Sequence, residues 1–221
     1  LAMDLRNHGG SPHGPMSYEA MADDVRETLA HYTSEPAIVL GHSMGGKTAM
    51  MLALRHPEQV RALIVADIAP AEGGFTRMDV PPDLANLHFP AELDRKGAET
   101  LLRPLIPNEA VRQMMVQNMT LGENPGWAIG LPDIMHSLPA IMDWPTLPAG
   151  TVYNGPTLFL KGELSPYIQP HNFAGMRALF PHYTLETIGS AGHWVHADAP
   201  LRFAQLVEDF VSKHSALNAA H

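Results

Sequence analysis

The chain has 221 residues, enough for one large domain with a substantial buried core, and its net charge of −9 argues against nucleic acid as a partner. The absence of cysteine excludes a disulfide scaffold and thiol chemistry. No apolar run approaches the ~20 residues that a membrane span needs, and no signal peptide is visible, so we expect a cytoplasmic protein.

The chain begins as a predicted strand, Leu1–Leu5, that runs into a loop at residues 7–15 dense in glycine and proline. This start has neither an initiator methionine nor a flexible leader, which indicates a fragment whose N-terminal part is absent; cleavage processing is the alternative. Ser17 can cap a helix that continues to about Tyr32, because apolar residues recur there at three- and four-residue spacing.

Apolar strand runs alternate with helical segments along the rest of the chain. The predicted elements are, in order, a strand at Ala37–Leu40, a helix ending near His56, a strand at Ala62–Ala66, a strand at Thr157–Leu160, a helix at Gln169–Phe180, a strand at Tyr183–Ile188 and a helix at Asp198–His214. This alternation predicts an α/β fold with a mostly parallel sheet and helices on both faces. Residues 71–155 are rich in proline and methionine and show no convincing strand. We therefore expect a core of residues 1–70 and 156–221, with a helical cap inserted at 71–155.

One octapeptide between a predicted strand and a predicted helix fits two catalytic motifs. Residues 41–48 read Gly-His-Ser-Met-Gly-Gly-Lys-Thr. As G-x-S-x-G they form a nucleophile elbow, a sharp turn that exposes Ser43 at a strained positive φ. As G-x-x-x-x-G-K-T they form a loop that cradles phosphate. Local context favours neither motif, so the rest of the chain has to decide.

The neighbours of the serine have structural interpretations of their own. Gly41 and Gly45 lie where side chains would crowd a tight turn, and Gly46 would let the helix approach the sheet closely. Lys47 reads as a solvated side chain in the first helical turn. His42 is either a substrate-binding residue or a packing residue.

A serine hydroxyl is a weak nucleophile and needs a histidine base, which in turn needs an acid to fix its tautomer. In sheets of this class the chain order is serine, acid, histidine, each at the carboxyl end of a strand. His193 satisfies this order, because it lies in the loop after the last predicted strand, where the preceding Gly189 and Gly192 let the backbone turn. His196 follows three residues later, but a metal pair would lack a third ligand at a recognisable spacing.

Two carboxylates compete for the role of the acid. Asp67 ends the strand Ala62–Ala66, at a carboxyl strand end between Ser43 and His193 in sequence. It could instead be a turn aspartate bonding its own backbone. Glu163 follows the next predicted strand and is the rival. We favour Asp67.

With these residues placed, the chain resembles the α/β-hydrolase superfamily, and within it the small esterases and thioesterases with a Gly-His-Ser-Met-Gly-Gly-Lys elbow. The resemblance implies Ser43 as nucleophile, His193 as base and Asp67 as acid. It also implies hydrolysis of a small carboxylic ester or thioester through an acyl-serine intermediate, with no cofactor and no metal. The matching segments span nearly the whole chain outside the insertion: Asp4–Gly9, Gly41–Lys47, Asp67–Pro70 and Gly192–His196.

Two departures from the superfamily pattern carry consequences. Most members place the acid one strand later, where this chain has no aspartate, which keeps Glu163 open. The superfamily also has strands before Leu1–Leu5, ending in a His-Gly loop that supplies one oxyanion N–H, and this segment is absent from the sequence. A molecule truly lacking it should have a damaged sheet and weak activity. The other donor, the backbone N–H of Met44, starts the elbow helix, where the helix dipole assists.

The insertion is expected to form a cap over Ser43. Its apolar residues either line an acyl pocket or form the core of the cap itself: Met114, Met115, Met119, Met135, Met142, Trp127 and Trp144. Trp194, next to the candidate base, is a further substrate-binding candidate.

Two other functions stay open at this point. A phosphate-loop nucleotide hydrolase would use Lys47 and Asp67, but it leaves His193 without a role. A non-catalytic binding protein could use the same scaffold.

Overall fold

The computed structural model describes residues 1–71 and 81–215, which form two compact units. Unit 1 comprises Leu1–Met16 and Thr76–Pro139, and unit 2 comprises Ser17–Phe75 and Ala140–His221. The expected division into a core and a cap at 71–155 stays a prediction, because the first segment of the chain belongs to the same unit as most of the insertion.

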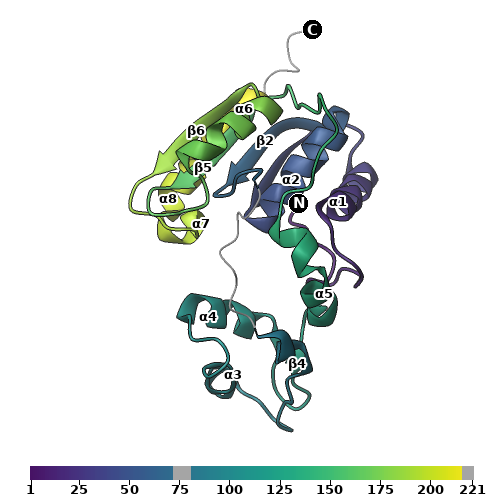
Figure 1. The fold of residues 1–221 in the computed structure, drawn as a ribbon, viewed down its shortest axis with the longest axis vertical. Helices are drawn as coiled ribbons and strands as arrows, with labels where there is room; N and C mark the ends of the chain where they lie inside the picture. Colours follow the sequence, from purple (N-terminus) through teal and green to yellow (C-terminus); the bar gives the residue numbers. More distant parts are fainter. Residues whose placement is uncertain (72–80, 216–221) are drawn as a thin grey trace. The chain divides into compact units, whose positions relative to one another are not determined.

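A four-stranded parallel sheet organises unit 2 (Figure 1). Ile64 pairs with Leu40 on one side and with Leu158 on the other, so a continuous register crosses three strands. The four strands predicted within this unit are confirmed, each within two residues of its expected ends. In spatial order they are β1 (Ala37–His42), β2 (Val60–Ala66), β5 (Thr157–Gly162) and β6 (Tyr183–Ile188).

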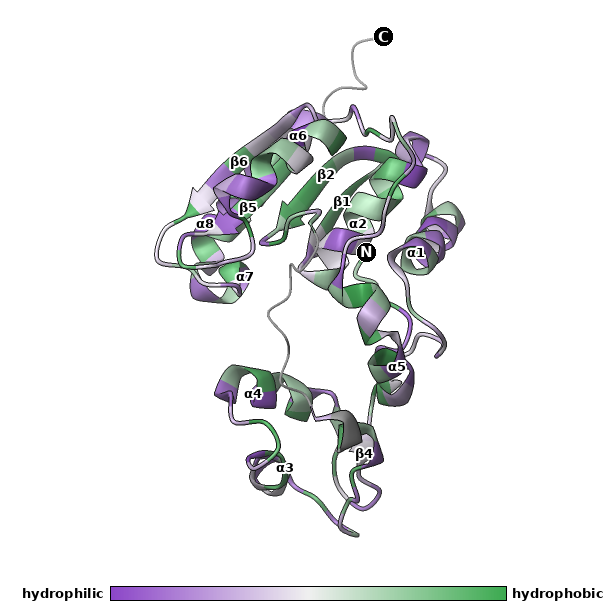
Figure 2. Cartoon of the chain, in the orientation of Figure 1, coloured by the Kyte–Doolittle hydropathy of each residue, from purple (hydrophilic) through white to green (hydrophobic). Residues whose placement is uncertain are grey.

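Helices cover both faces of this sheet, as expected. On one face lie α1 (Tyr18–Tyr32), α2 (Met44–Arg55) and α6 (Phe173–Leu179), and on the other lies α8 (Pro200–Ser215) (Figure 1). Successive strand residues point to opposite faces. Phe159 therefore meets Phe180 at the end of α6, with ring centroids 5.8 Å apart, while Leu158 clusters with Leu206 of α8. In Figure 2 the central strand β2 is mostly hydrophobic, as a strand buried on both faces must be.

The helix ends follow local sequence signals. Ser17 caps α1 as predicted, since its hydroxyl accepts a hydrogen bond from the Ala20 N–H at 3.1 Å. The helix expected at Asp198–His214 is confirmed as α8, which begins at Pro200, and a separate short helix, α7 (Val195–Asp198), precedes it. Pro200 disfavours helical backbone at the residue before it, and Ala199 accordingly has φ −140°. The helix expected at Gln169–Phe180 likewise opens with a 3₁₀ turn, η3 (Pro170–Asn172).

The predicted strand Leu1–Leu5 is wrong, because these residues pair with no strand of the described sheets. The backbone carbonyl of Asp4 accepts the Ser11 hydroxyl at 2.7 Å, a turn contact in place of a ladder bond. The insertion also contains one short antiparallel pair that its sequence pattern did not reveal, β3 (Met119–Thr120) with β4 (Gly126–Trp127). A ladder of two residues is too short to leave a periodic signal.

Unit 1 has a hydrophobic core of its own. Met115 and Met119 are buried in it, and Met114, Met135 and Trp127 pack against it, so these residues belong to the core of the insertion. Among the described helices, none is both long and apolar enough to cross a membrane. The remaining elements are η1 (Pro57–Gln59) in unit 2, η2 (Pro82–Asn86), α3 (Arg95–Leu102) and α4 (Glu109–Gln117) in unit 1, and α5 (Leu131–Met142), which ends in unit 2.

Candidate active site

Ser43 occupies the sharp turn between β1 and α2. Its backbone has φ 54° and ψ −120°, the strained conformation that the elbow motif predicts. A Cβ on Gly41 would lie 2.1 Å from the carbonyl oxygen of Gly45, so the turn can close only with glycine there. A Cβ on Gly46 would lie 2.8 Å from the Ile68 side chain and 3.2 Å from that of Val65 in β2, which confirms that this glycine lets the helix approach the sheet.

Two expectations about the octapeptide are wrong. A Cβ on Gly45 would meet nothing within 4 Å, because this residue lies within α2 and the space beside its Cα is open. Lys47 is fully buried rather than solvated. Its ammonium donates to the backbone carbonyls of Ala71 at 3.3 Å and Asp143 at 3.1 Å, and burial lowers its pKa to about 8.

The structure brings the predicted serine, histidine and aspartate into one hydrogen-bonded chain within unit 2. Nε2 of His193 lies 3.0 Å from the Ser43 hydroxyl, and Nδ1 of His193 lies 2.8 Å from an Asp67 carboxylate oxygen. An ionised carboxylate can only accept, so the Nδ1–H donates to Asp67. Nε2 then carries a lone pair that accepts the Ser43 O–H. This is the arrangement in which imidazole can remove a proton from a serine.

The Asp67 carboxylate accepts two hydrogen bonds besides the one from the histidine. It directly follows β2, is fully buried and has φ 52°. One carboxylate oxygen accepts the Gly162 N–H at 2.9 Å, and the other accepts the hydroxyl of buried Ser165. These donors stabilise the charged carboxylate where water does not reach it.

Sequence reasoning missed Ser165. The one available signal was its place just after β5, because the carboxyl ends of neighbouring parallel strands meet at one edge of the sheet. The Tyr167 ring, also missed, lies 4.2 Å from the His193 ring between centroids.

Glu163 does not approach the histidine in this arrangement. Its carboxylate accepts the Ser190 N–H at 2.7 Å, and Ser190 has φ 58°. Glu163 therefore fixes the backbone of the loop that carries His193, while Asp67 contacts the imidazole.

His42 lies beside the base. Its Nε2–H donates to the backbone carbonyl of His193 at 2.8 Å, and burial lowers its pKa to about 4, so the ring stays neutral at ordinary pH. Its ring centroid lies 4.7 Å from that of His193 and 5.4 Å from that of Trp194. Trp194 is 38% exposed, which leaves its ring accessible to a ligand. The His196 ring also belongs to this cluster, with its centroid 5.0 Å from that of His42.

Within residues 1–71 and 81–215, no group of three histidine or acidic side chains could hold a metal ion.

The Met44 N–H belongs to the first turn of α2, whose leading amides have no partner within the helix. It stands next to Ser43 in sequence, at the positive end of the helix dipole. A negatively charged oxygen on a carbon atom bonded to the Ser43 oxygen would therefore lie near this donor.

The Asp4–Gly9 segment lies in unit 1, where the Asn7 side chain accepts a hydrogen bond from the Gly14 N–H and donates one to the Gly14 carbonyl.

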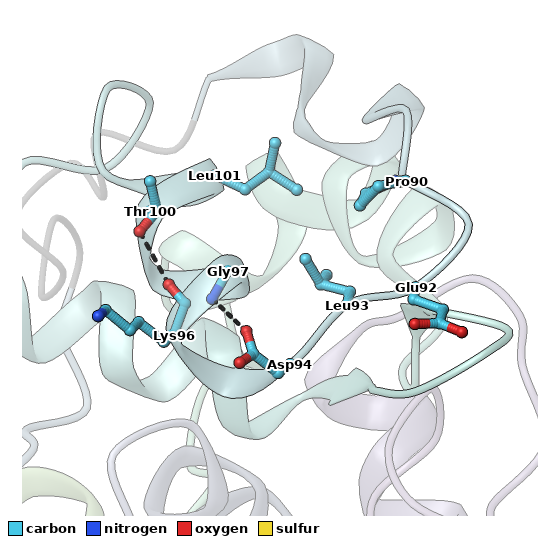
Figure 3. A pocket seen from close by; sticks show the side chains of 8 residues that line it. All are labelled: Pro90, Glu92, Leu93, Asp94, Lys96, Gly97, Thr100 and Leu101. Atoms are coloured by element: carbon cyan, nitrogen blue, oxygen red, sulfur yellow. Dashed lines mark hydrogen bonds between the residues drawn. The ribbon is translucent and has the colours of Figure 1, made fainter.

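A separate cavity of about 520 Å³ in unit 1 is drawn in Figure 3. It contains none of the predicted site residues, and its lining includes Leu93, Asp94 and Leu101.

Comparisons with known proteins identify the family of the fold. Residues 1–200 match the family model of the alpha/beta hydrolase fold. The chain is 37% identical to a mouse sn-1-specific diacylglycerol lipase, ABHD11, over 96% of this chain and 71% of the relative. It is 34% identical to the esterase YbfF of Escherichia coli, over 90% and 77% respectively. A marine microorganism esterase superposes with a TM-score of 0.83 at 37% identity, over 94% of this chain and 82% of that one. The chain therefore belongs to the α/β-hydrolase family.

Proposed function

We propose that Ser43, His193 and Asp67 form the catalytic triad of an ester hydrolase. The observation that carries the proposal is the continuous pair of hydrogen bonds from the Ser43 hydroxyl through His193 to buried Asp67. This family includes esterases among its members, and the three similar proteins named above are lipases or esterases by name.

The geometry supports acyl transfer to water in two halves. As the Ser43 oxygen attacks the carbonyl carbon, His193 Nε2 takes its proton and Asp67 stabilises the resulting imidazolium. The Met44 N–H donates to the developing oxyanion. His193 then gives its proton to the leaving alcohol or thiol, and a water repeats the cycle on the acyl-serine. His42 supports the base by holding its backbone carbonyl, and Trp194 contacts substrate.

The substrate is proposed to be a small acyl ester or thioester, with an acylglycerol as a candidate suggested by the name of the mouse relative. The insertion at 71–155 is proposed to act as a cap that binds the acyl chain. A cytoplasmic location and the absence of nucleic acid partners stay predictions of the sequence.

The decisive experiment measures turnover of a panel of p-nitrophenyl esters, acylglycerols and acyl-thioesters by the wild-type chain and by Ser43→Ala. Labelling by a fluorophosphonate reports the reactivity of the serine independently of substrate choice. We expect labelling of the wild type and loss of both labelling and turnover in the variant. Wild-type protein that is folded but is not labelled would favour a non-catalytic binding protein. ATP hydrolysis that survives Ser43→Ala and is lost in Lys47→Ala would favour the nucleotide hydrolase.

A further inference from the structure

Lys47 is a buried charged side chain that the proposed reaction does not use. It lies in the first turn of α2, and its backbone N–H donates to the Ser43 carbonyl at 3.0 Å. A cation in that turn is opposed by the helix dipole, and the burial of an ammonium is unfavourable unless its contacts compensate. The contacts of the Lys47 side chain therefore indicate its role.

These contacts join segments that are distant in the sequence. The ammonium donates to the carbonyl of Ala71, where the predicted insertion begins, and to that of Asp143, which directly follows α5. The Asp143 carboxylate adds an attractive charge, and the ammonium lies 5.5 Å over the centroid of the Tyr18 ring. The Tyr18 hydroxyl in turn donates to the Ile141 carbonyl at 2.5 Å. All five residues belong to unit 2.

We propose that Lys47 is a positioning residue that fixes the first residue of the insertion, Ala71, and the segment after α5 to the helical turn carrying Ser43 and the Met44 N–H. The proposal rests on the proposed ester hydrolysis at Ser43 and extends it to substrate size. Because the Lys47 ammonium donates to the carbonyls of both Ala71 and Asp143, moving either carbonyl away from the other or from the elbow would break a charge-assisted hydrogen bond. An ester whose acyl chain reaches into the insertion depends on these anchors, whereas a short acyl ester does not.

The absence of cysteine permits a closely matched test. Lys47→Cys introduces a single thiol, which can be alkylated in denaturant before refolding. Alkylation with 2-bromoethylamine rebuilds a side chain of lysine length that ends in an ammonium. Alkylation with 1-bromopropane gives the same length ending in a methyl group. If refolding fails, Lys47→Met expressed directly replaces the propyl form, with the wild type as its partner.

Two measurements then compare the two forms. Hydrogen exchange of peptides covering residues 64–71 and 139–146 reports the anchors without requiring activity. Because a hydrogen bond to a charged group contributes about 1.5–3 kcal/mol, we expect these peptides to exchange about tenfold faster in the propyl form. The KM for an octanoyl ester should rise about tenfold in that form. Its kcat for an acetyl ester and its fluorophosphonate labelling rate should stay within about threefold of the ammonium form.

Equal exchange in the two forms would overturn the anchoring. Faster exchange with an unchanged octanoyl KM, or with equal losses on both esters, would show that Lys47 only supports folding and would overturn its positioning role. A wild type that neither hydrolyses esters nor reacts with the fluorophosphonate would refute the proposed function. The exchange measurement would still decide whether Lys47 holds the two segments.

Discussion

Replacing Asp67 by asparagine gives the sharpest test of the triad, because the surrounding donors fix how the amide must lie. One oxygen position of Asp67 accepts the Gly162 N–H, a backbone donor that cannot turn away. The asparagine oxygen should occupy that position, which leaves the NH₂ facing His193 Nδ1. An NH₂ donates, so the His193 proton moves to Nε2. Nε2 then presents a proton to Ser43 and can no longer accept one.

The expected loss is large for an almost isosteric change. In serine proteases the corresponding exchange lowers kcat by about 10⁴, equivalent to about 5 kcal/mol of transition-state stabilisation. We expect a loss of this order in kcat for an acetyl ester, with a parallel loss in the rate of fluorophosphonate labelling. Circular dichroism should show that the variant is folded, because the Gly162 bond is retained.

Glu163→Gln is the matched control, since Glu163 is the alternative acid suggested by the sequence. Its carboxylate accepts the Ser190 N–H, and a glutamine oxygen can accept the same bond. We expect its kcat within about threefold of the wild type, as for a change outside the reacting groups. An Asp67→Asn variant with more than a tenth of wild-type activity, combined with an inactive Glu163→Gln, would refute the assignment.

Three further predictions concern the elbow and its buried titratable groups. Gly41→Ala should destabilise the protein by about 3 kcal/mol or more, a fall in Tm of about 10 °C, because the added Cβ would overlap the Gly45 carbonyl. Gly45→Ala adds a Cβ in open space on a helix, so it should be neutral or stabilising in the same thermal melts. The pKa of His42 is lowered to about 4, so between pH 7 and pH 5 the unfolded chain binds a proton that the folded chain does not. The stability of the wild type relative to His42→Gln should therefore fall by about 1–2 kcal/mol from pH 7 to pH 5. A difference in urea unfolding that does not change with pH would contradict this. The pKa of Lys47 is lowered to about 8, so stability relative to Lys47→Met should rise by about 1 kcal/mol from pH 8 to pH 9. An unchanged difference over that range would show that the folded protein keeps the proton.

The sequence by itself determined those features that depend on local chemistry. The elbow motif around Ser43 predicted the strained turn, and the apolar runs predicted the four strands of unit 2. The chain order of Ser43, Asp67 and His193 placed all three at carboxyl strand ends, where a parallel sheet brings them together. These signals are short-range, so they can be read without knowing what packs against them.

The tertiary structure decided what depends on partners distant in sequence. Lys47 reads as a surface residue until Ala71 and Asp143 bring carbonyls to its ammonium, and Ser165 gains a role only because β5 lies beside β2. Glu163 and Asp67 were distinguished by which carboxylate reached the imidazole, a distance that no spacing encodes. Leu1–Leu5 has the composition of a strand, but a strand forms only where a neighbour supplies the hydrogen bonds of a ladder.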